Sequence, residues 1–249
     1  PATIAAGLVL GPLVWTFVFA LNDLHDLPSD QHNPRKSNAP LVTGVLTPAD
    51  LRLCVRWSAT GAVMAAAVAG PAFVAGTTAV LVLGWMYSVP PIRLKGRPGA
   101  DVAVNAIVVG VFGPLAGWSL HRPVFDYPPI LVVLGLFLAT ALYLPTTVID
   151  LIADRAAGYA TAAVRWSASA CYRAGLLSWA IANAAWLACC HLGVFVARDS
   201  WLVQTVAAPL LVALYADLAR RPSIPRLAVI AVAFAVPATD FLLTYARVS

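Results

Sequence analysis

The sequence predicts an all-α protein, a polytopic bundle of eight transmembrane helices that forms a single domain over residues 1–249. Of its 249 residues, 61% are hydrophobic and 11% are charged, and the mean hydropathy is +0.82. Soluble domains carry roughly a quarter charged residues. Several apolar stretches approach the roughly 20 residues that an α-helix needs to cross a bilayer. Because such helices satisfy their own backbone groups in lipid, a helical bundle follows.

Local signals divide the apolar sequence into spans. Thr47 followed by Pro48 indicates a helix start with an N-cap and a proline in the first turn. Gly70-Pro71 indicates a tight hairpin between the second and third spans. The expected spans are Thr3–Leu21, Leu51–Ala69, Ala72–Val89, Val102–Leu120, Ile130–Val148, Ala174–Val196, Trp201–Leu218 and Leu227–Tyr245.

The basic residues predict the orientation of these spans. Four spans separate the acidic segments 22–30 and 150–154, so both segments lie on the same side. Thirteen of the sixteen Lys and Arg residues then share that side, and only Arg122, Arg198 and Arg247 lie opposite. By the positive-inside rule, both segments face the cytoplasm, in what we expect to be a bacterial-type cell membrane.

The order of features also suggests a duplication. Spans one to four and spans five to eight each present a span, an acidic loop, a hairpin, a basic loop and a final span. Duplicated halves are common in membrane folds. The similarity is in order and not in residues.

The net charge of +5 does not indicate a nucleic-acid partner in a membrane protein, where basic residues set topology and contact lipid headgroups. We expect membrane lipid as a partner and infer no protein partner. The four cysteines show no metal-binding spacing and are interpreted as free thiols.

The first acidic motif is NDLHDLPSD, residues 22–30. Asn22, Asp26 and Asp30 are four residues apart, so on a helix they share one face. Asp23 points about 100° away from Asn22 on a helix, but it becomes a possible ligand if Pro28 ends the helix and the loop turns back.

A second pair, Asp150 and Asp154 in DLIADRAAG, repeats the four-residue spacing. Closely spaced carboxylates suit Mg²⁺, which binds proteins through few side chains and prefers substrate phosphates as further ligands. Acids at helix ends are often only solvated or capping. Two clusters on one membrane side instead favour a pair of metal sites bridged by a diphosphate.

Cationic side chains near both motifs fit a diphosphate ligand. Arg35 and Lys36 follow the first motif, Arg155 lies within the second, and Arg93 and Lys95 lie in the loop YSVPPIRLKGRPG. They would stabilise the charge on a departing diphosphate. The loop cations could equally be topology residues that contact lipid headgroups.

Three further residues have two readings each. Tyr87 is either an interface aromatic or a substrate contact beside the basic loop. Asp101 and Asn105 either line the cavity or cap and hydrogen-bond the fourth span.

These motifs together resemble the UbiA superfamily of intramembrane prenyltransferases, whose signatures are Asn-x-x-x-Asp-x-x-x-Asp, Tyr-Ser-x-Pro-Pro and Asp-x-x-x-Asp. The resemblance covers nearly the whole chain, and three ordered motifs make it specific. The matching residues are Asn22, Asp26 and Asp30 for the first signature, Tyr87, Ser88, Pro90 and Pro91 for the loop, and Asp150 and Asp154 for the last.

The resemblance implies a central cavity open to the lipid and Mg²⁺-dependent ionisation of a prenyl diphosphate. Asp26, Asp30, Asp150 and Asp154 would be the catalytic metal ligands, assisted by Asn22. A lipophilic aromatic or isoprenoid acceptor would then capture the allylic cation. The substrate-binding residues would be Asn22, Lys36, Tyr87, Arg93, Lys95 and Arg155, followed by Asp23, Arg35, Asp101 and Asn105 as further candidates.

The chain departs from the family pattern at two points. The family has nine helices and its first signature follows the second helix, whereas here it follows the first span, so one helix is expected to be missing. Many members have Arg at the position of Ala39, which leaves Lys36 or Arg35 as the anion contact in this segment.

Other activities fit parts of the sequence. The superfamily includes membrane terpene cyclases, in which the cation is captured by a double bond of the same substrate. A transporter would place its ion sites near the midplane, which the position of the acids at one face disfavours. CDP-alcohol phosphotransferases require Asp-Gly in their first motif, where this chain has Leu27 and Pro28.

Overall fold

The computed structural model describes residues 1–31, 33, 36–194, 196 and 198–248. All regular elements in these ranges are helical, and eight segments are long and apolar enough to cross a membrane. The predicted fold class and number of spans are confirmed. The spans are α1 (Ala2–Leu8), η1 (Val9–Leu13) and α2 (Val14–Asp30) in succession, α3 (Pro48–Ala69), α4 (Pro71–Ser88), α5 (Ala100–Ile107), η4 (Val108–Phe112) and α6 (Gly113–Ser119) in succession, α7 (Pro129–Ile149), α10 (Ala168–Leu192), η6 (Arg198–Ser200) with α11 (Trp201–Leu218), and α12 (Ile224–Val248).

Four short helices lie in the connections between these spans. They are η3 (Leu94–Gly96), η5 (Val124–Asp126), α8 (Leu151–Ala156) and α9 (Ala162–Trp166).

The second and third spans begin where the local signals predicted. Thr47 caps α3, because its side chain accepts the Asp50 N–H at 3.2 Å while the Asp50 carboxylate accepts the Thr47 N–H at 2.8 Å. Gly70 alone connects α3 to α4, with a φ of 120° that glycine adopts at no steric cost. This confirms the hairpin.

The first span is longer than predicted. We expected it to end at Leu21, but α2 continues to Asp30 and includes Pro28. A proline in the last turns of a helix removes only one hydrogen bond near the end, so the helix need not stop there. The whole first acidic motif is therefore helical.

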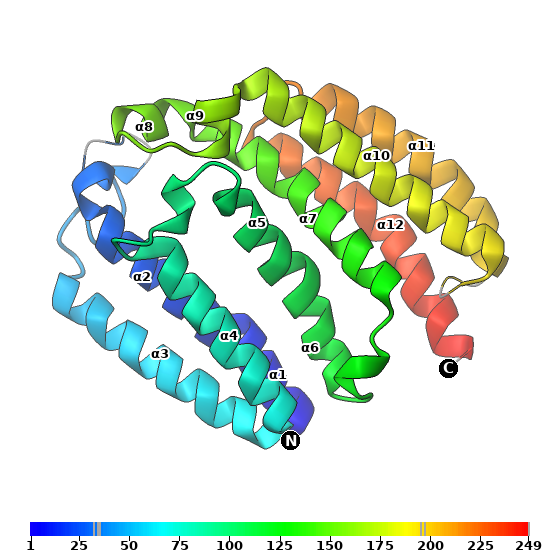
Figure 1. Ribbon diagram of the computed structural model, residues 1–249, viewed down its shortest axis with the longest axis horizontal. Coiled ribbons are helices and arrows are strands. Elements are labelled where there is room, and N and C mark those ends of the chain that lie inside the picture. The colour runs from blue at the N-terminus through cyan, green and yellow to red at the C-terminus, as the bar shows by residue number, and fades with distance from the viewer. Residues whose placement is uncertain (32, 34–35, 195, 197, 249) are drawn as a thin grey trace.

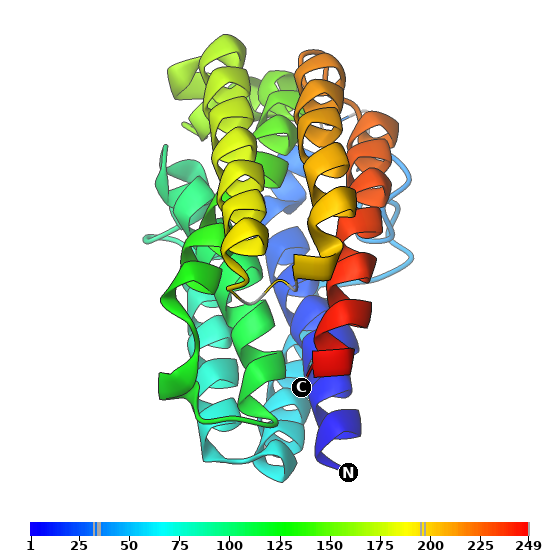
Figure 2. The same cartoon turned by 90° about the vertical axis from the view of Figure 1, so that its right-hand side faces the viewer.

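The spans form two half-bundles (Figure 1), and Figure 2 shows them running along a common direction. One half has a core of α1, α2, α3 and α4 that includes Phe17, Ala62 and Phe73. The other has a core of α7, α10, α11 and α12 around Trp179 and Tyr215, whose rings stack. The span formed by α5, η4 and α6 lies between α4 and α7.

The span between the half-bundles packs closely on α7 where η4 crosses this helix at two glycines. A Cβ atom on Gly110 would overlap the carbonyl oxygen of Gly135, and one on Gly135 would overlap that of Gly110. The two backbones therefore touch, which is typical of small residues between membrane helices.

We predict that Gly135→Ala destabilises the protein by about 1–3 kcal/mol, the usual cost of overpacking. Thermal unfolding of the purified protein in detergent tests this. Gly76→Ala in α4 is the matched control, because its added methyl group meets no atom within 4 Å. Equal unfolding temperatures for the two variants would contradict the glycine contact.

Candidate functional site

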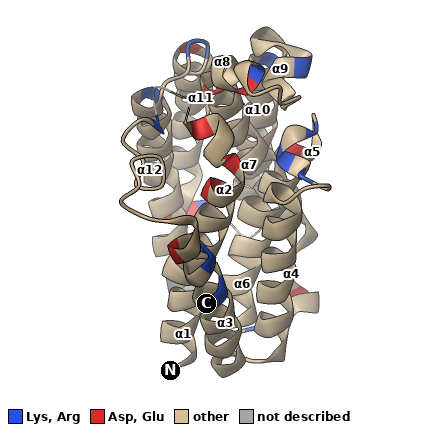
Figure 3. Ribbon diagram, turned by 90° about the vertical axis from the view of Figure 1, so that its left-hand side faces the viewer, with Lys and Arg blue, Asp and Glu red and all other residues tan. Residues whose placement is uncertain are grey.

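Both acidic motifs line a single polar cavity of about 350 Å³. It lies at the end of the bundle that α8 and α9 cover, where Figure 3 shows acidic residues on α2 and basic residues just before α5. Its polar lining consists of Asn22, Asp23, Asp26, Ser29, Asp30, Asn33, Lys36, Tyr87, Lys95, Tyr143, Thr146, Thr147, Asp150, Asp154, Tyr159 and Thr161.

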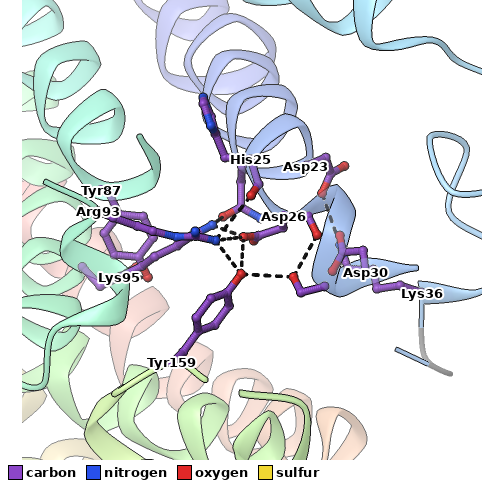
Figure 4. Close-up of polar contacts among 12 residues, drawn as sticks. Asp23, His25, Asp26, Asp30, Lys36, Tyr87, Arg93, Lys95 and Tyr159 are labelled. Atoms are coloured by element: carbon purple, nitrogen blue, oxygen red, sulfur yellow. Dashed lines mark hydrogen bonds and ion pairs between the residues drawn. The ribbon is translucent and has the colours of Figure 1, made fainter. Parts of the chain in front are cut away.

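Asp26 is the most heavily paired acid of this cavity (Figure 4). Its Oδ1 accepts a hydrogen bond from Arg93 Nη2 at 2.8 Å, and its Oδ2 accepts one from Lys95 Nζ at 2.6 Å. Lys95 also donates to Asn22 Oδ1 at 2.8 Å. The predicted cations of the basic loop therefore lie on the first acidic motif.

The basic loop reaches Asp26 because its backbone turns sharply at Arg93. This residue has φ 39° and ψ 62°, in the left-handed region, and begins the short helix η3. Lys95 is only 7% exposed. Burial lowers the pKa of Lys95, while the Asp26 carboxylate acts in the opposite direction. Arg97 is exposed and donates instead to the Pro91 carbonyl oxygen at 3.2 Å.

Lys36 pairs with the other acids of α2. Its Nζ lies 3.2 Å from Asp23 Oδ1 and 3.6 Å from Asp30 Oδ2. Burial lowers the pKa of Lys36, but these two carboxylates together raise it by more, so the net shift is upward. Asp23 lines the cavity from a continuous helix, without the break at Pro28 that we considered.

The second motif begins where α7 ends. Asp150 is the C-cap of α7, and Asp154 follows one turn later in α8. The Asp154 carboxylate accepts a hydrogen bond from Thr161 Oγ1 at 2.9 Å. Burial, with smaller contributions from Asp150 and Asp26, raises the pKa of Asp154 to about 6. The ionised Asp154 carboxylate therefore lacks compensating positive charge, which a cation bound beside it would supply.

Tyr87 is half-buried and lines the cavity, as the substrate-contact alternative requires. Its hydroxyl lies 2.9 Å from the hydroxyl of Tyr143 and accepts a hydrogen bond from Asn105 Nδ2 at 3.3 Å. Asn105 supports Tyr87 from behind and is absent from the cavity lining.

Two other described candidates, Asp101 and Arg155, do not line the cavity. Asp101 is fully buried and accepts the backbone N–H groups of Gly99 at 2.9 Å and Ala162 at 2.8 Å, so it holds the start of α9 against α5. The cavity-lining alternative for Asp101 is therefore wrong. Arg155 is exposed and does not line the cavity, and Arg35 lies outside the described residues.

Sequence reasoning missed two tyrosines of the cavity. Tyr143 lies seven residues before Asp150, or two turns along α7, and this spacing could have placed it on the same face. Tyr159 follows the second motif in an irregular segment, and no sequence signal indicated that it reaches Asp26.

An apolar cavity of about 610 Å³ extends toward the other end of α2. Trp15 lines this cavity and Phe19 lines the polar one. Their rings stack with centroids 5.4 Å apart, so α2 connects the two cavities through adjoining aromatic groups. Other lining residues are Val14, Phe73, Val80, Val108, Phe112, Leu115 and Phe125.

The donor atoms of the polar cavity fit a hard cation. In the described part of the chain no three His, Cys, Asp or Glu side chains already surround one point. The oxygen atoms of Asn22, Asp26, Asp30, Asp150 and Asp154 nevertheless face one cavity, and carboxylate and amide oxygens are the ligands that Mg²⁺ prefers. Binding would require Asp26 to exchange its cationic partners.

A sequence profile of the UbiA prenyltransferase family matches residues 1–239. The chain belongs to the UbiA prenyltransferase family. This confirms the resemblance seen in the motifs and, with the eight apolar helices, identifies an integral membrane protein. Members of the UbiA family are enzymes that use prenyl diphosphates.

Solved structures of UbiA homologues are similar to this structure. A UbiA homologue from Archaeoglobus fulgidus, solved with DMAPP and Mg²⁺, has a TM-score of 0.71 at 22% identity, over 97% of this chain and 86% of that one. The apo structure of a UbiA homologue from Aeropyrum pernix K1 has a TM-score of 0.74 at 17% identity, over 98% and 91% of the two chains.

A curated relative is the lycopene elongase/hydratase of Haloarcula japonica. It is 28% identical over 174 residues, which is 67% of this chain and 55% of that protein. The match therefore spans little more than half the length of this relative.

We predict that Asp26→Ala destabilises the protein by about 1–3 kcal/mol, because it leaves the charges of Lys95 and Arg93 together without their carboxylate. Thermal unfolding without added ligand measures the change. The double variant Asp26→Ala with Lys95→Met should recover part of the loss. A double variant that is less stable than Asp26→Ala would contradict this pairing.

Proposed function

We propose that this UbiA protein ionises a prenyl diphosphate with Mg²⁺ and transfers the prenyl group to a lipophilic acceptor within the membrane. The observation that supports this most strongly is the presence of two different cavities along α2, whose lining residues Trp15 and Phe19 stack on each other. One is lined by carboxylates and cations, and the other is apolar. A molecule with an anionic head and a hydrocarbon tail matches both.

The residues we expect to hold Mg²⁺ are Asp26, Asp30, Asp150 and Asp154, with Asn22 as an additional oxygen ligand. The structures of the Archaeoglobus fulgidus homologue with Mg²⁺ and with DMAPP or GPP support this cofactor and substrate class. When bound, the metal supplies positive charge that offsets the negative charge on the leaving diphosphate.

The cations on Asp26 would then change partners. The Asp26 carboxylate uses both oxygens for Arg93 and Lys95, so as a metal ligand it would release these two cations, which could then contact the diphosphate. Arg93 already has a spare donor, because its buried Nε–H has no hydrogen-bond partner among the described residues. Lys95 also donates to Asn22 Oδ1 at 2.8 Å, the oxygen that Asn22 would offer to the metal ion.

Lys36 and Tyr87 are the other proposed substrate contacts. Lys36 lies between Asp23 and Asp30 at the cavity, where a diphosphate could share its charge. The Tyr87 hydroxyl is fixed by Tyr143 and Asn105 at the cavity wall. Both side chains can therefore orient the head group without large movement.

The transfer breaks the bond between the allylic carbon and the diphosphate oxygen, and the diphosphate leaves with the electron pair. A new bond then forms between that carbon and the acceptor, and the acceptor loses one proton. The apolar lining excludes water from the cation between these events. The similarity to a lycopene elongase/hydratase is our reason for proposing an isoprenoid hydrocarbon, rather than an aromatic compound, as the acceptor. We place both acidic motifs on the cytoplasmic side, in line with the distribution of basic residues.

We expect Asp26→Ala and Asp150→Ala to lower diphosphate release from labelled C5 to C20 prenyl diphosphates by at least about 100-fold, because each removes a charge that stabilises the transition state. Membranes containing the protein, assayed with and without Mg²⁺, measure the release. Asp126→Ala, at the opposite end of the bundle in η5, is the control that keeps wild-type activity. Undiminished release in either acidic-motif variant would refute the proposal.

The products of the same assay separate transfer from cyclisation. Transfer requires added acceptor and yields a prenylated product, identified by mass. Cyclic hydrocarbon or alcohol formed from the diphosphate alone would instead identify a terpene cyclase, the rival that the sequence left open.

A further inference from the structure

Tyr159 has no part in the chemistry proposed above, yet it lies at the centre of the polar contacts in Figure 4. It follows Gly158 in the irregular segment between α8 and α9. Its backbone N–H donates to the Asp154 carbonyl oxygen at 2.9 Å. Its position is therefore fixed by the second acidic motif.

Its side chain contacts the first acidic motif and the basic loop. The hydroxyl accepts a hydrogen bond from Arg93 Nη2, donates to Asp26 Oδ1 at 3.2 Å, and lies 3.1 Å from Ser29 Oγ. The Arg93 guanidinium lies over the ring, with Cζ 4.6 Å from its centroid. Tyr159 thus joins three segments that are far apart in the sequence.

The hydroxyl of Tyr159 can keep two hydrogen-bond partners when the Asp26 carboxylate turns away from it. Ser29 Oγ donates its proton to the Asp26 carbonyl oxygen at 2.8 Å, so its oxygen remains free to accept. The single proton of Tyr159 therefore has two acceptors, the Asp26 carboxylate and Ser29. If Asp26 turns toward a metal ion, Tyr159 can donate to Ser29 and still accept from Arg93.

We propose that Tyr159 is a positioning residue that holds the Arg93 guanidinium at the polar cavity while Arg93 exchanges Asp26 for the substrate diphosphate. This inference rests on the proposed function, because it assigns the diphosphate as the incoming partner of Arg93. The hydroxyl and ring of Tyr159 both contact Arg93, so we assign the effect of Tyr159 to Arg93 and not to contact with the reacting atoms.

A double-mutant cycle tests this with Tyr159→Phe, which removes the hydroxyl and keeps the ring. Arg93 contacts the diphosphate before and during ionisation, so KM for the prenyl diphosphate should rise with little change in kcat. We expect an increase of about three- to tenfold, the effect of one ordinary hydrogen bond. In an Arg93→Gln background the same change should alter KM by less than about twofold.

Two further variants complete the experiment. Tyr172→Phe is the control, because it removes a phenol hydroxyl that donates to the Ala216 carbonyl oxygen in the other half-bundle; its KM should equal that of the wild type. Ser29→Ala removes the second acceptor of Tyr159. Ser29→Ala should raise KM by less than Tyr159→Phe does, and this increase should also vanish in the Arg93→Gln background. Ser29→Ala replaces Tyr159→Phe in the test if the tyrosine variant does not fold.

The outcomes are distinct. Unchanged KM in Tyr159→Phe, or an equal increase with and without Arg93, overturns the positioning role while the proposed function stands. If the wild-type protein releases no diphosphate from any of the prenyl diphosphates tested, the proposed function and this inference are both overturned.

Discussion

The ion pairs of Asp26 determine how the polar end of this protein is arranged. A carboxylate that is mostly buried in an apolar bundle requires compensating charge, and Arg93 and Lys95 supply it from the loop between α4 and α5. The same contacts draw the loop against α2 and bring Tyr159 over the first motif. We propose that Arg93 and Lys95 occupy the Asp26 carboxylate until a metal ion and a diphosphate replace these contacts.

The rest of the fold maintains the distance between the two acidic motifs. The first motif belongs to one half-bundle and the second to the other, so their separation depends on how the halves meet. Contact between Gly110 and Gly135 fixes the crossing of η4 and α7. Asp101 fixes the far side of the second motif by accepting the Ala162 N–H group at the start of α9. Residues outside the polar cavity therefore help to set the distance between the two acidic motifs.

Much of this arrangement follows from local sequence patterns. The lengths of the apolar runs predicted eight spans, and the four-residue spacing placed Asn22, Asp26 and Asp30 on one helix. The contacts of Tyr159 could not be predicted, because they join residues more than 60 and more than 130 positions apart. Proximity in sequence instead favoured Arg155, which the structure places on the exposed side of the second motif.

The end of the first span shows the same limit. We expected the span to end at Leu21 and considered a break at Pro28, but a proline near the C-terminus of a helix removes too little hydrogen bonding to end it. Likewise, Asp101 has a carboxylate that could bind a ligand, but it accepts backbone N–H groups at the starts of two helices instead. Only tertiary structure distinguishes these roles, since both use the same carboxylate.

The exchange of partners at Asp26 is the central claim, and a structure with Mg²⁺ and a non-hydrolysable prenyl thiodiphosphate tests it most directly. The account predicts metal ions on Asp26 and on Asp150 or Asp154, the diphosphate on Arg93 and Lys95, and the prenyl tail in the apolar cavity beside Trp15 and Phe73. An Asp26 carboxylate still paired with Lys95 and Arg93 in that complex, or a tail outside this cavity, would contradict it.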